Sequence, residues 1–291
     1  MREDGDIDTQ LVIDQSTPAY TVRAVAERLG VPTPTLRSWT LRYGIGPQRH
    51  QRGRHRNYTE ADIAILERMV ALIRAGASPA SAARTAIPQR QPASDDLDRL
   101  LAAAFRLDSA DLLGILDSNF REHGVVATWD HLCRPAFASV VEQQYDAGGC
   151  IDVEHILSWA VTTSLHRLPA PAADRRNAVV LACTSNESHA LPLEALRAAL
   201  AEAHVAASML GAGVPDDALG DALSRGEGRA TAVLWAQGPD TADLSAVQTA
   251  IDAQARVFVA GPGWDDVDLP PEVGRIDSLP AAVDLLQQRA S

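Results

Sequence analysis

Two short stretches near the N-terminus repeat apolar residues every three or four positions, which is the period of an amphipathic helix. The first begins at Thr21 and is closed by Gly30, and the second starts with Thr33 as its cap and ends near Tyr43. Only Gly30-Val31-Pro32 separates the two stretches. The pattern therefore predicts a helix-turn-helix.

The next segment, residues 47–58, is polar, interrupted by glycine and bounded by turn formers, so we interpret it as a β-hairpin wing. Thr59 and Asp62 then have the spacing of a capping box, which predicts a helix from that point to about Ala75. A further short helix is expected from Ser78.

Helical periods return after the proline-containing linker at residues 87–94. Between residues 95 and 168 they are interrupted near Asp108, at Gly124 and at Gly148-Gly149. Four helical segments separated by such breaks are typical of a four-helix bundle.

Beyond a second linker, rich in proline and alanine, short apolar runs alternate with amphipathic segments. The expected strands are 178–183, 205–210, 230–236 and 257–260. This alternation predicts a doubly wound, flavodoxin-like (Rossmann-type) parallel sheet, and hence a multidomain α and α/β protein. The predicted parts are a disordered tail at 1–19, a winged helix-turn-helix at 20–87, a bundle at 95–168 and an α/β domain at 177–291.

The charge of the chain is unevenly distributed. Its 291 residues have a net charge of −12, yet residues 20–58 contain eight arginines and one acidic residue, Glu27. This segment carries +7, so the remainder sums to −19. A solvated charged face is the alternative interpretation, but a single-signed cluster repels itself unless an anion neutralises it, and this cluster coincides with the helix-turn-helix. We therefore expect double-stranded DNA as the partner.

The three cysteines, Cys133, Cys150 and Cys183, are odd in number and widely spaced, which fits neither a disulfide framework nor a zinc site. We expect reduced thiols in a cytoplasmic protein. The N-terminus lacks the basic start and apolar core of a leader, and no apolar run reaches membrane-spanning length. Neither secretion nor membrane insertion is expected.

The basic segment closely resembles the winged helix-turn-helix of MerR-family transcription regulators over residues 20–86. The resemblance is carried by Tyr20-Thr21-Val22, Gly30-Val31, Thr35-Leu36-Arg37-Ser38-Trp39, Arg42-Tyr43-Gly44 and Arg54-His55-Arg56-Asn57-Tyr58. It implies that the second helix enters the major groove and that the wing approaches phosphates.

This resemblance assigns two kinds of DNA contact. Base edges are expected to be read by Thr33, Thr35 and Ser38. Phosphates are expected to be bound by Arg37, Arg42, Arg49, Arg52, Arg54 and Arg56. Tyr43, His55 and Tyr58 complete the expected DNA-binding surface. Trp39 and Tyr43 also fit core positions, since aromatic residues on short helices are commonly buried, and that alternative stays open.

The rest of the chain resembles the light- and cobalamin-responsive CarH/LitR branch of the MerR family. The matching residues are Trp129, Leu132-Cys133-Arg134-Pro135-Ala136, Glu154-His155 and Glu187-Ser188-His189. The resemblance implies a cobalamin, adenosylcobalamin in that branch, with His189 as the lower axial ligand of cobalt. It places Glu187 behind the imidazole ring, and Glu154 and His155 over the upper face of the corrin.

Several positions depart from the pattern of this branch. Pro192 replaces the glycine of the axial-histidine motif, and Leu234, followed by Trp235, replaces a serine of the nucleotide-tail pocket. Gln144 and Tyr145 stand where a tryptophan and a histidine are expected. A retained cobalamin and a sensor without cobalamin both remain open, and light-driven ligation by two histidines is not expected.

The leading hypothesis is a transcription regulator that binds a partly palindromic operator as a homo-oligomer, a dimer or tetramer, with RNA polymerase as a further expected partner. In one alternative the α/β domain binds another small molecule or serves oligomerisation only. An alternative of another class is a cobalamin-dependent enzyme or corrinoid carrier. The fused DNA-binding segment and the lack of a convincing nucleophile with a nearby base favour a protein that is not an enzyme.

Overall fold

The structure is a computed structural model, which describes residues 20–46, 57–87, 92–169, 179–225 and 228–290. The chain divides into two compact units, residues 1–88 and 89–291. The first unit, called the head below, contains the helix-turn-helix. The second contains the helical bundle and the parallel sheet, which the sequence predicted as two domains. The tail expected at residues 1–19 lies outside the described residues.

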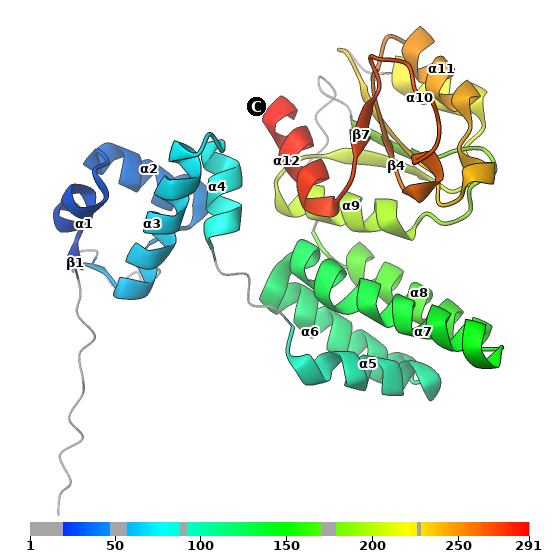
Figure 1. The fold of residues 1–291 in the computed structure, drawn as a ribbon, viewed down its shortest axis with the longest axis horizontal. Helices are drawn as coiled ribbons and strands as arrows, with labels where there is room; N and C mark the ends of the chain where they lie inside the picture. Colours follow the sequence, from blue (N-terminus) through cyan, green and yellow to red (C-terminus); the bar gives the residue numbers. More distant parts are fainter. Residues whose placement is uncertain (1–19, 47–56, 88–91, 170–178, 226–227, 291) are drawn as a thin grey trace, which may run out of the picture. The chain divides into compact units, whose positions relative to one another are not determined.

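The head consists of short helices and one small antiparallel pair of strands (Figure 1). Its elements are β1 (Tyr20–Thr21), α1 (Val22–Leu29), α2 (Thr33–Tyr43), β2 (Asn57–Tyr58), α3 (Glu60–Arg74) and α4 (Pro79–Ala86). The pairing of β1 with β2 was not predicted, because two residues carry no detectable alternation. It fixes the end of the predicted wing segment to the start of α1.

Helix ends in the head follow local rules. Thr21 caps α1 by accepting a hydrogen bond from the Ala24 amide, and Gly30 closes the helix with a left-handed φ of 65°. The capping box of Thr59 and Asp62 at the start of α3 is confirmed. The prediction that Thr33 caps α2 is wrong: Thr33 is the first residue of the helix, and its cap, Pro32, makes no side-chain hydrogen bond.

The helical bundle also follows its predicted breaks. It comprises α5 (Ser94–Phe105), α6 (Ser109–Thr128), a π-helical turn η1 (Trp129–Cys133), α7 (Arg134–Ala147) and α8 (Ile151–His166). Gly124 interrupts α6 with a φ of 79°, so the chain bends there and resumes as a helix at Val125.

The sheet is parallel throughout and has the order β4-β3-β5-β6-β7, which confirms the predicted flavodoxin-like topology. Its strands are β3 (Val179–Cys183), β4 (Ala207–Gly211), β5 (Thr231–Trp235), β6 (Arg256–Ala260) and β7 (Gly274–Ile276). The helices are α9 (Leu191–Glu202), α10 (Asp216–Ser224), α11 (Leu244–Asp252) and α12 (Leu279–Ala290), with 3-10 turns η2 (Pro239–Thr241) and η3 (Pro262–Trp264). The sequence missed β7, which has three residues and no apolar run.

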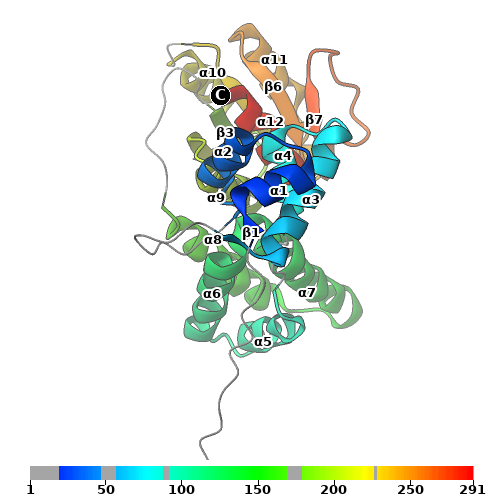
Figure 2. The ribbon, with the colours of Figure 1, turned by 90° about the vertical axis from the view of Figure 1, so that its left-hand side faces the viewer.

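The two faces of the sheet have separate cores. Helices α10 and α11 cover one face, and α9 and α12 cover the other. Helix α9 also contacts α6 and α8, so it lies between the sheet and the bundle (Figures 1 and 2). The core of the bundle therefore continues into the core beneath α9.

Polar contacts reinforce this packing. The Glu202 carboxylate at the end of α9 accepts hydrogen bonds of 3.0 and 3.2 Å from the Val125 amide, where α6 resumes. Arg197 donates to the carbonyl oxygen of Leu165 at 3.2 Å. These contacts join α9 to two helices of the bundle. No helix in the described part of the chain combines the length and apolarity needed to cross a membrane.

Replacing Glu202 tests the junction between α9 and α6. Because Val125 is fully buried, Glu202→Ala leaves its amide without an acceptor, which costs about 1–3 kcal/mol. We expect that loss in the free energy of unfolding of the second unit, measured by urea denaturation. The exposed Glu142 on α7 provides the control, Glu142→Ala, which should change stability by less than about 0.5 kcal/mol. Equal effects of the two substitutions would contradict the assigned role.

Candidate DNA-binding surface and ligand cavity

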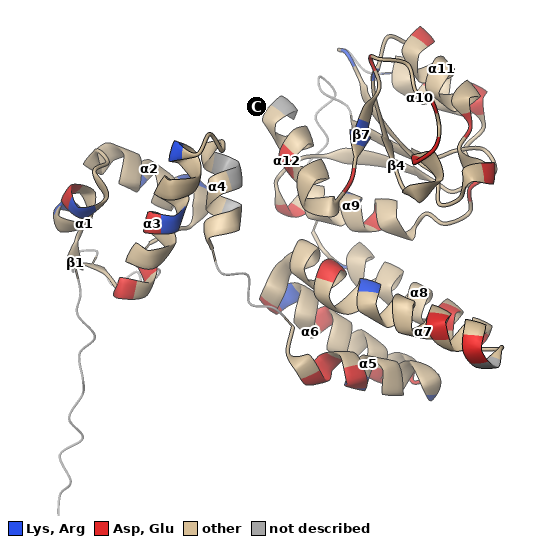
Figure 3. Ribbon diagram, viewed as in Figure 1, with Lys and Arg blue, Asp and Glu red and all other residues tan. Residues whose placement is uncertain are grey.

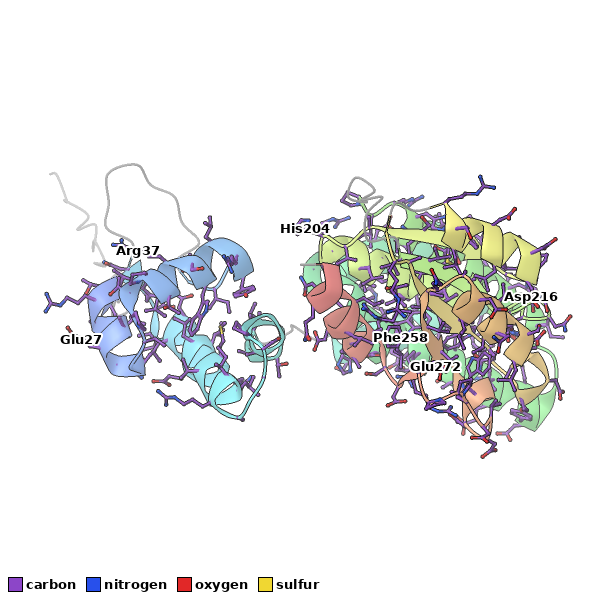
Figure 4. All side chains as sticks on the ribbon, turned by 90° about the horizontal axis from the view of Figure 1, so that it is seen from above. Glu27, Arg37, His204, Asp216, Phe258 and Glu272 are labelled. Atoms are coloured by element: carbon purple, nitrogen blue, oxygen red, sulfur yellow. The ribbon has the colours of Figure 1, made fainter. Side chains whose placement is uncertain are left out.

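Helix α2 presents one face to the interior of the head and another to its surface. Leu36 and Trp39 are buried, at 0% and 8% exposure, so Trp39 belongs to the core. Arg37 and Arg42 are exposed, and neither pairs with a carboxylate among the described residues. Figure 4 shows Arg37 at the outer surface of the head. The predicted base readers, Thr33, Thr35 and Ser38, are half-buried, as is Tyr43.

Other arginines of the head serve its structure. Arg28 on α1 forms ion pairs with Glu60 and Glu67 on α3, at 3.1 and 3.0 Å. Hydrogen bonds from Tyr20 and Arg28 lower the pKa of Glu60, which favours its charged form. Arg74 donates to the carbonyl oxygen of Leu29 at 3.2 Å. Unlike Arg28 and Arg74, Arg37 and Arg42 on the exposed face of α2 make no contact that stabilises the described part of the head.

The structure describes Tyr58 but not residues 47–56 of the predicted wing. The predicted phosphate ligands Arg49, Arg52, Arg54 and Arg56, together with His55, lie outside the described residues. Tyr58 is described and is only 3% exposed, with its hydroxyl 3.3 Å from the Thr40 hydroxyl. Its assignment to the DNA-binding surface was therefore wrong, since the ring fills the core of the head.

The second unit contains a cavity of about 1200 Å³ between the bundle and the sheet. Trp129, Arg134, Phe137, Glu154 and His155 line it from the bundle. His189, Trp235, Gly261 and Arg275 are among the residues that line it from the sheet. The structure thus brings together the three sequence-predicted residues Glu154, His155 and His189. The cavity lies at the carboxyl ends of β3 and β5. The strand order reverses there, and open α/β sheets bind ligands at such a point.

His189 is oriented by Glu187, as the sequence predicted. The Nδ1 atom of His189 lies 2.6 Å from Oε1 of Glu187, and the same oxygen accepts the His189 amide at 2.7 Å. Glu187 is 1% exposed, whereas 63% of the His189 side chain is exposed. With Nδ1 engaged by the carboxylate, the described structure leaves Nε2 available to a metal.

Two further residues, which the sequence reasoning missed, hold Glu187 in place. Its Oε2 atom accepts hydrogen bonds from the Thr241 hydroxyl at 2.6 Å and the Gln237 amide at 2.7 Å. Burial by itself raises the pKa of Glu187, but these hydrogen bonds and those from His189 outweigh it and lower the pKa to about 2. The carboxylate is therefore charged at neutral pH. Both residues follow β5, far from Glu187 in sequence, so no motif signals them.

His189 is an exposed residue just before the start of α9. Pro192, where the family motif has glycine, occupies the first turn of α9. Proline is favourable there, because the amide it lacks has no acceptor within the helix. The replacement thus strengthens the start of α9 without displacing His189 from the cavity.

The bundle side of the cavity combines aromatic and polar residues. Gln144, at the position of the expected tryptophan, donates to Glu154 at 2.8 Å. Arg134 lies 3.4 Å from Asp130, and both line the cavity. Tyr145, at the position of the expected histidine, is 87% exposed and is not among the lining residues.

Leu234, which replaces a serine of the nucleotide-tail pocket in the family pattern, does not line this cavity. Leu234 is fully buried against α10 and α11, on the opposite face of the sheet. Side chains alternate along a strand, so the neighbouring Trp235 faces the cavity instead. Gly261, with a φ of 103°, packs so closely on the Ala236 carbonyl that a β-carbon would clash with it. Trp235, and not Leu234, therefore contributes its side chain to the cavity wall.

The cysteines give no alternative metal site. Cys133 and Cys183 are buried, and burial raises the pKa of both thiols, that of Cys183 to about 12. Across the described ranges, no group of three or more histidine, cysteine, aspartate or glutamate side chains is arranged to hold a metal ion.

The combination of a helix-turn-helix head with a bundle packed on a flavodoxin-type sheet is that of a transcription regulator with a cobalamin-binding-like module, as the following comparisons support. Residues 20–86 match the MerR HTH family of regulatory proteins, so the head is a MerR-type domain. The chain is 27% identical over 224 residues to the HTH-type transcriptional repressor CarH of Myxococcus xanthus, covering 70% of this chain and 74% of that protein. These matches confirm the resemblance expected from the sequence.

Among solved structures, the monomethylamine corrinoid protein of Methanosarcina barkeri is similar in fold. The TM-score is 0.50 at 10% identity, and the match covers 67% of this chain and 98% of that one. At this identity the likeness concerns the fold alone.

The charge state of Glu187 makes stability depend on pH. Its pKa in the folded protein, about 2, is below the ordinary value of about 4.5, so its contribution is complete above pH 4.5 and is lost as the pH falls toward 2. We expect Glu187→Gln to cost on the order of 3 kcal/mol at pH 7 and progressively less below pH 4.5. Unfolding free energies measured between pH 7 and pH 2.5 check this.

The exposed Glu272 (Figure 4) supplies the control, because Glu272→Gln should show no such convergence with the wild type. A difference between Glu187→Gln and the wild type that stays constant as the pH falls would contradict the charged role of Glu187.

Proposed function

We propose that the protein is a sequence-specific, DNA-binding transcription regulator whose second unit is a cobalamin-responsive sensor. The observation that carries the sensor proposal is the pairing of His189 with the buried Glu187 at the mouth of a 1200 Å³ cavity. The MerR-type head supports the DNA-binding part. The similarity to CarH, a transcriptional repressor, supports the combination of a DNA-binding head and a sensor unit in one chain.

The head acts through α2 and the wing. Arg37 and Arg42 bind phosphates, and Thr33, Thr35 and Ser38 lie on the same helix for contacts to base edges. Acidic side chains on bundle helices such as α5 and α7 (Figure 3) would repel DNA, so binding is confined to the head. A single head covers a small site, and a homo-oligomer places two heads on one operator.

The residues around the cavity fit a corrin in three respects. One imidazole is oriented toward the cavity, the volume suits a large ligand, and the buried Nε1 atom of the cavity-lining Trp235 has no hydrogen-bond partner in the described structure. When bound, cobalamin would supply a cobalt centre that accepts a nitrogen ligand. His189 would hold it through Nε2, with Glu187 fixing the ring, and Glu154 and His155 would contact the ligand from the bundle.

Regulation requires that the effector bind one assembly of the protein better than another, because equal affinity for both shifts no equilibrium. The cavity is lined by both the bundle and the sheet, so a bound ligand contacts two elements at once. The fused MerR-type head and the similarity to a transcriptional repressor favour a regulator over an enzyme.

The DNA-binding proposal predicts a change in salt dependence. Arg37→Ala removes one phosphate contact, so the slope of log affinity against log salt should decrease by about 0.9. Fluorescence anisotropy on a duplex selected from random sequences, at several salt concentrations, measures this slope. Arg225→Ala, at the exposed residue that follows α10, is the control and should leave the slope unchanged. An unaltered slope for Arg37→Ala would exclude its phosphate contact.

The sensor proposal predicts that the purified protein retains adenosylcobalamin through gel filtration in darkness. The bound corrin is detected by its visible absorption, and His189→Ala should lose most of it because the axial ligand is gone. His131→Ala, an exposed histidine of η1, should retain the colour. A colourless wild-type protein would exclude cobalamin and leave a regulator whose second unit binds another molecule or only assembles.

A further inference from the structure

Helix α2 exposes one large apolar side chain. Leu41 is 87% exposed, although the other large apolar residues of this helix, Leu36 and Trp39, are buried. The preceding residue, Thr40, points into the head. Its hydroxyl lies 3.0 Å from the carbonyl oxygen of Leu36 and 2.9 Å from that of Ile45, and these contacts oppose a rotation of α2 that would bury Leu41. The orientation of α2 therefore holds Leu41 in solvent.

The neighbours of Leu41 indicate what covers it. Arg37 lies one helical turn earlier on the same face, and Arg42 is adjacent. Both arginines are exposed and unpaired with carboxylates within the described residues, so this face attracts a polyanion. An apolar side chain between two such cations suits a partner that combines phosphates with an apolar group.

Duplex DNA provides that combination. In the major groove, the thymine C5-methyl is the apolar group that base edges present, whereas all other features of the edges are hydrogen-bond donors or acceptors. We propose that Leu41 is a specificity-determining residue of the head and packs against the methyl group of a thymine in the operator. The proposal rests on the proposed DNA-binding function and concerns which bases are read.

The test compares thymine with uracil, which differs only in lacking the methyl group. A binding site is first selected from random duplexes with the full-length protein. Each thymine in the site is then replaced in turn by deoxyuridine, and affinities are measured for the wild type, Leu41→Ala and Leu41→Met. Burial of one methyl-sized group corresponds to about a fourfold difference in affinity.

We expect one position in each half-site at which uracil weakens wild-type binding about fourfold. Leu41→Ala should bind the thymine and uracil duplexes equally at that position, and Leu41→Met, which keeps an apolar tip, should retain the discrimination. Leu244→Ala, which removes an exposed leucine at the start of α11, is the matched control and should behave as the wild type.

Three results would overturn the proposal: no uracil substitution affects the wild type, Leu41→Ala keeps the same sensitivity to uracil, or Leu41→Ala unfolds at a lower temperature than Leu244→Ala does relative to the wild type. The last would show that Leu41 packs on the protein itself. Failure to select any DNA site is a different outcome, because it would refute the DNA-binding function on which the proposal rests.

Discussion

The buried carboxylate of Glu187 is the contact on which the cavity depends. Its two oxygens accept hydrogen bonds from the His189 amide, the Gln237 amide and the Thr241 hydroxyl, so one group connects the loop after β3 to the loop after β5. A buried charge is tolerated only when it is satisfied in this way. The position of the His189 ring follows from this network, and so does the crevice between the two strands.

Helix α9 extends this constraint to the bundle. It begins just after His189 and ends at Glu202, which binds the Val125 amide at the bend of α6. Beyond that bend the chain continues into η1, whose Trp129 lines the cavity opposite the sheet. Helix α9 thus positions both His189 and the bundle wall of the cavity. A ligand in the cavity would therefore contact residues that are held by the two ends of this helix.

In the head, the fold separates arginines that look alike in sequence. Arg28 and Arg74 bind partners within the head, while Arg37 and Arg42 on α2 face solvent. The net positive charge of residues 20–58 attracts DNA. Only arginines without a partner inside the head are free to neutralise phosphates and so release the counterions held by DNA. The exposure of Leu41 beside them adds an apolar feature that composition and charge do not show.

Hydrophobic periodicity and turn residues were sufficient for the helix-turn-helix, the four bundle helices, four of the five strands and the sheet class, because these depend on local spacing. The pairing of Glu187 with His189 was implied by the resemblance to the CarH/LitR branch, whose motif keeps the two residues close in sequence. Tertiary structure alone decided that Tyr58 is core, that Trp235 and not Leu234 faces the cavity, and that Thr241 and Gln237 hold Glu187. These outcomes depend on which strand face meets which helix and on contacts between distant residues, which local patterns do not encode.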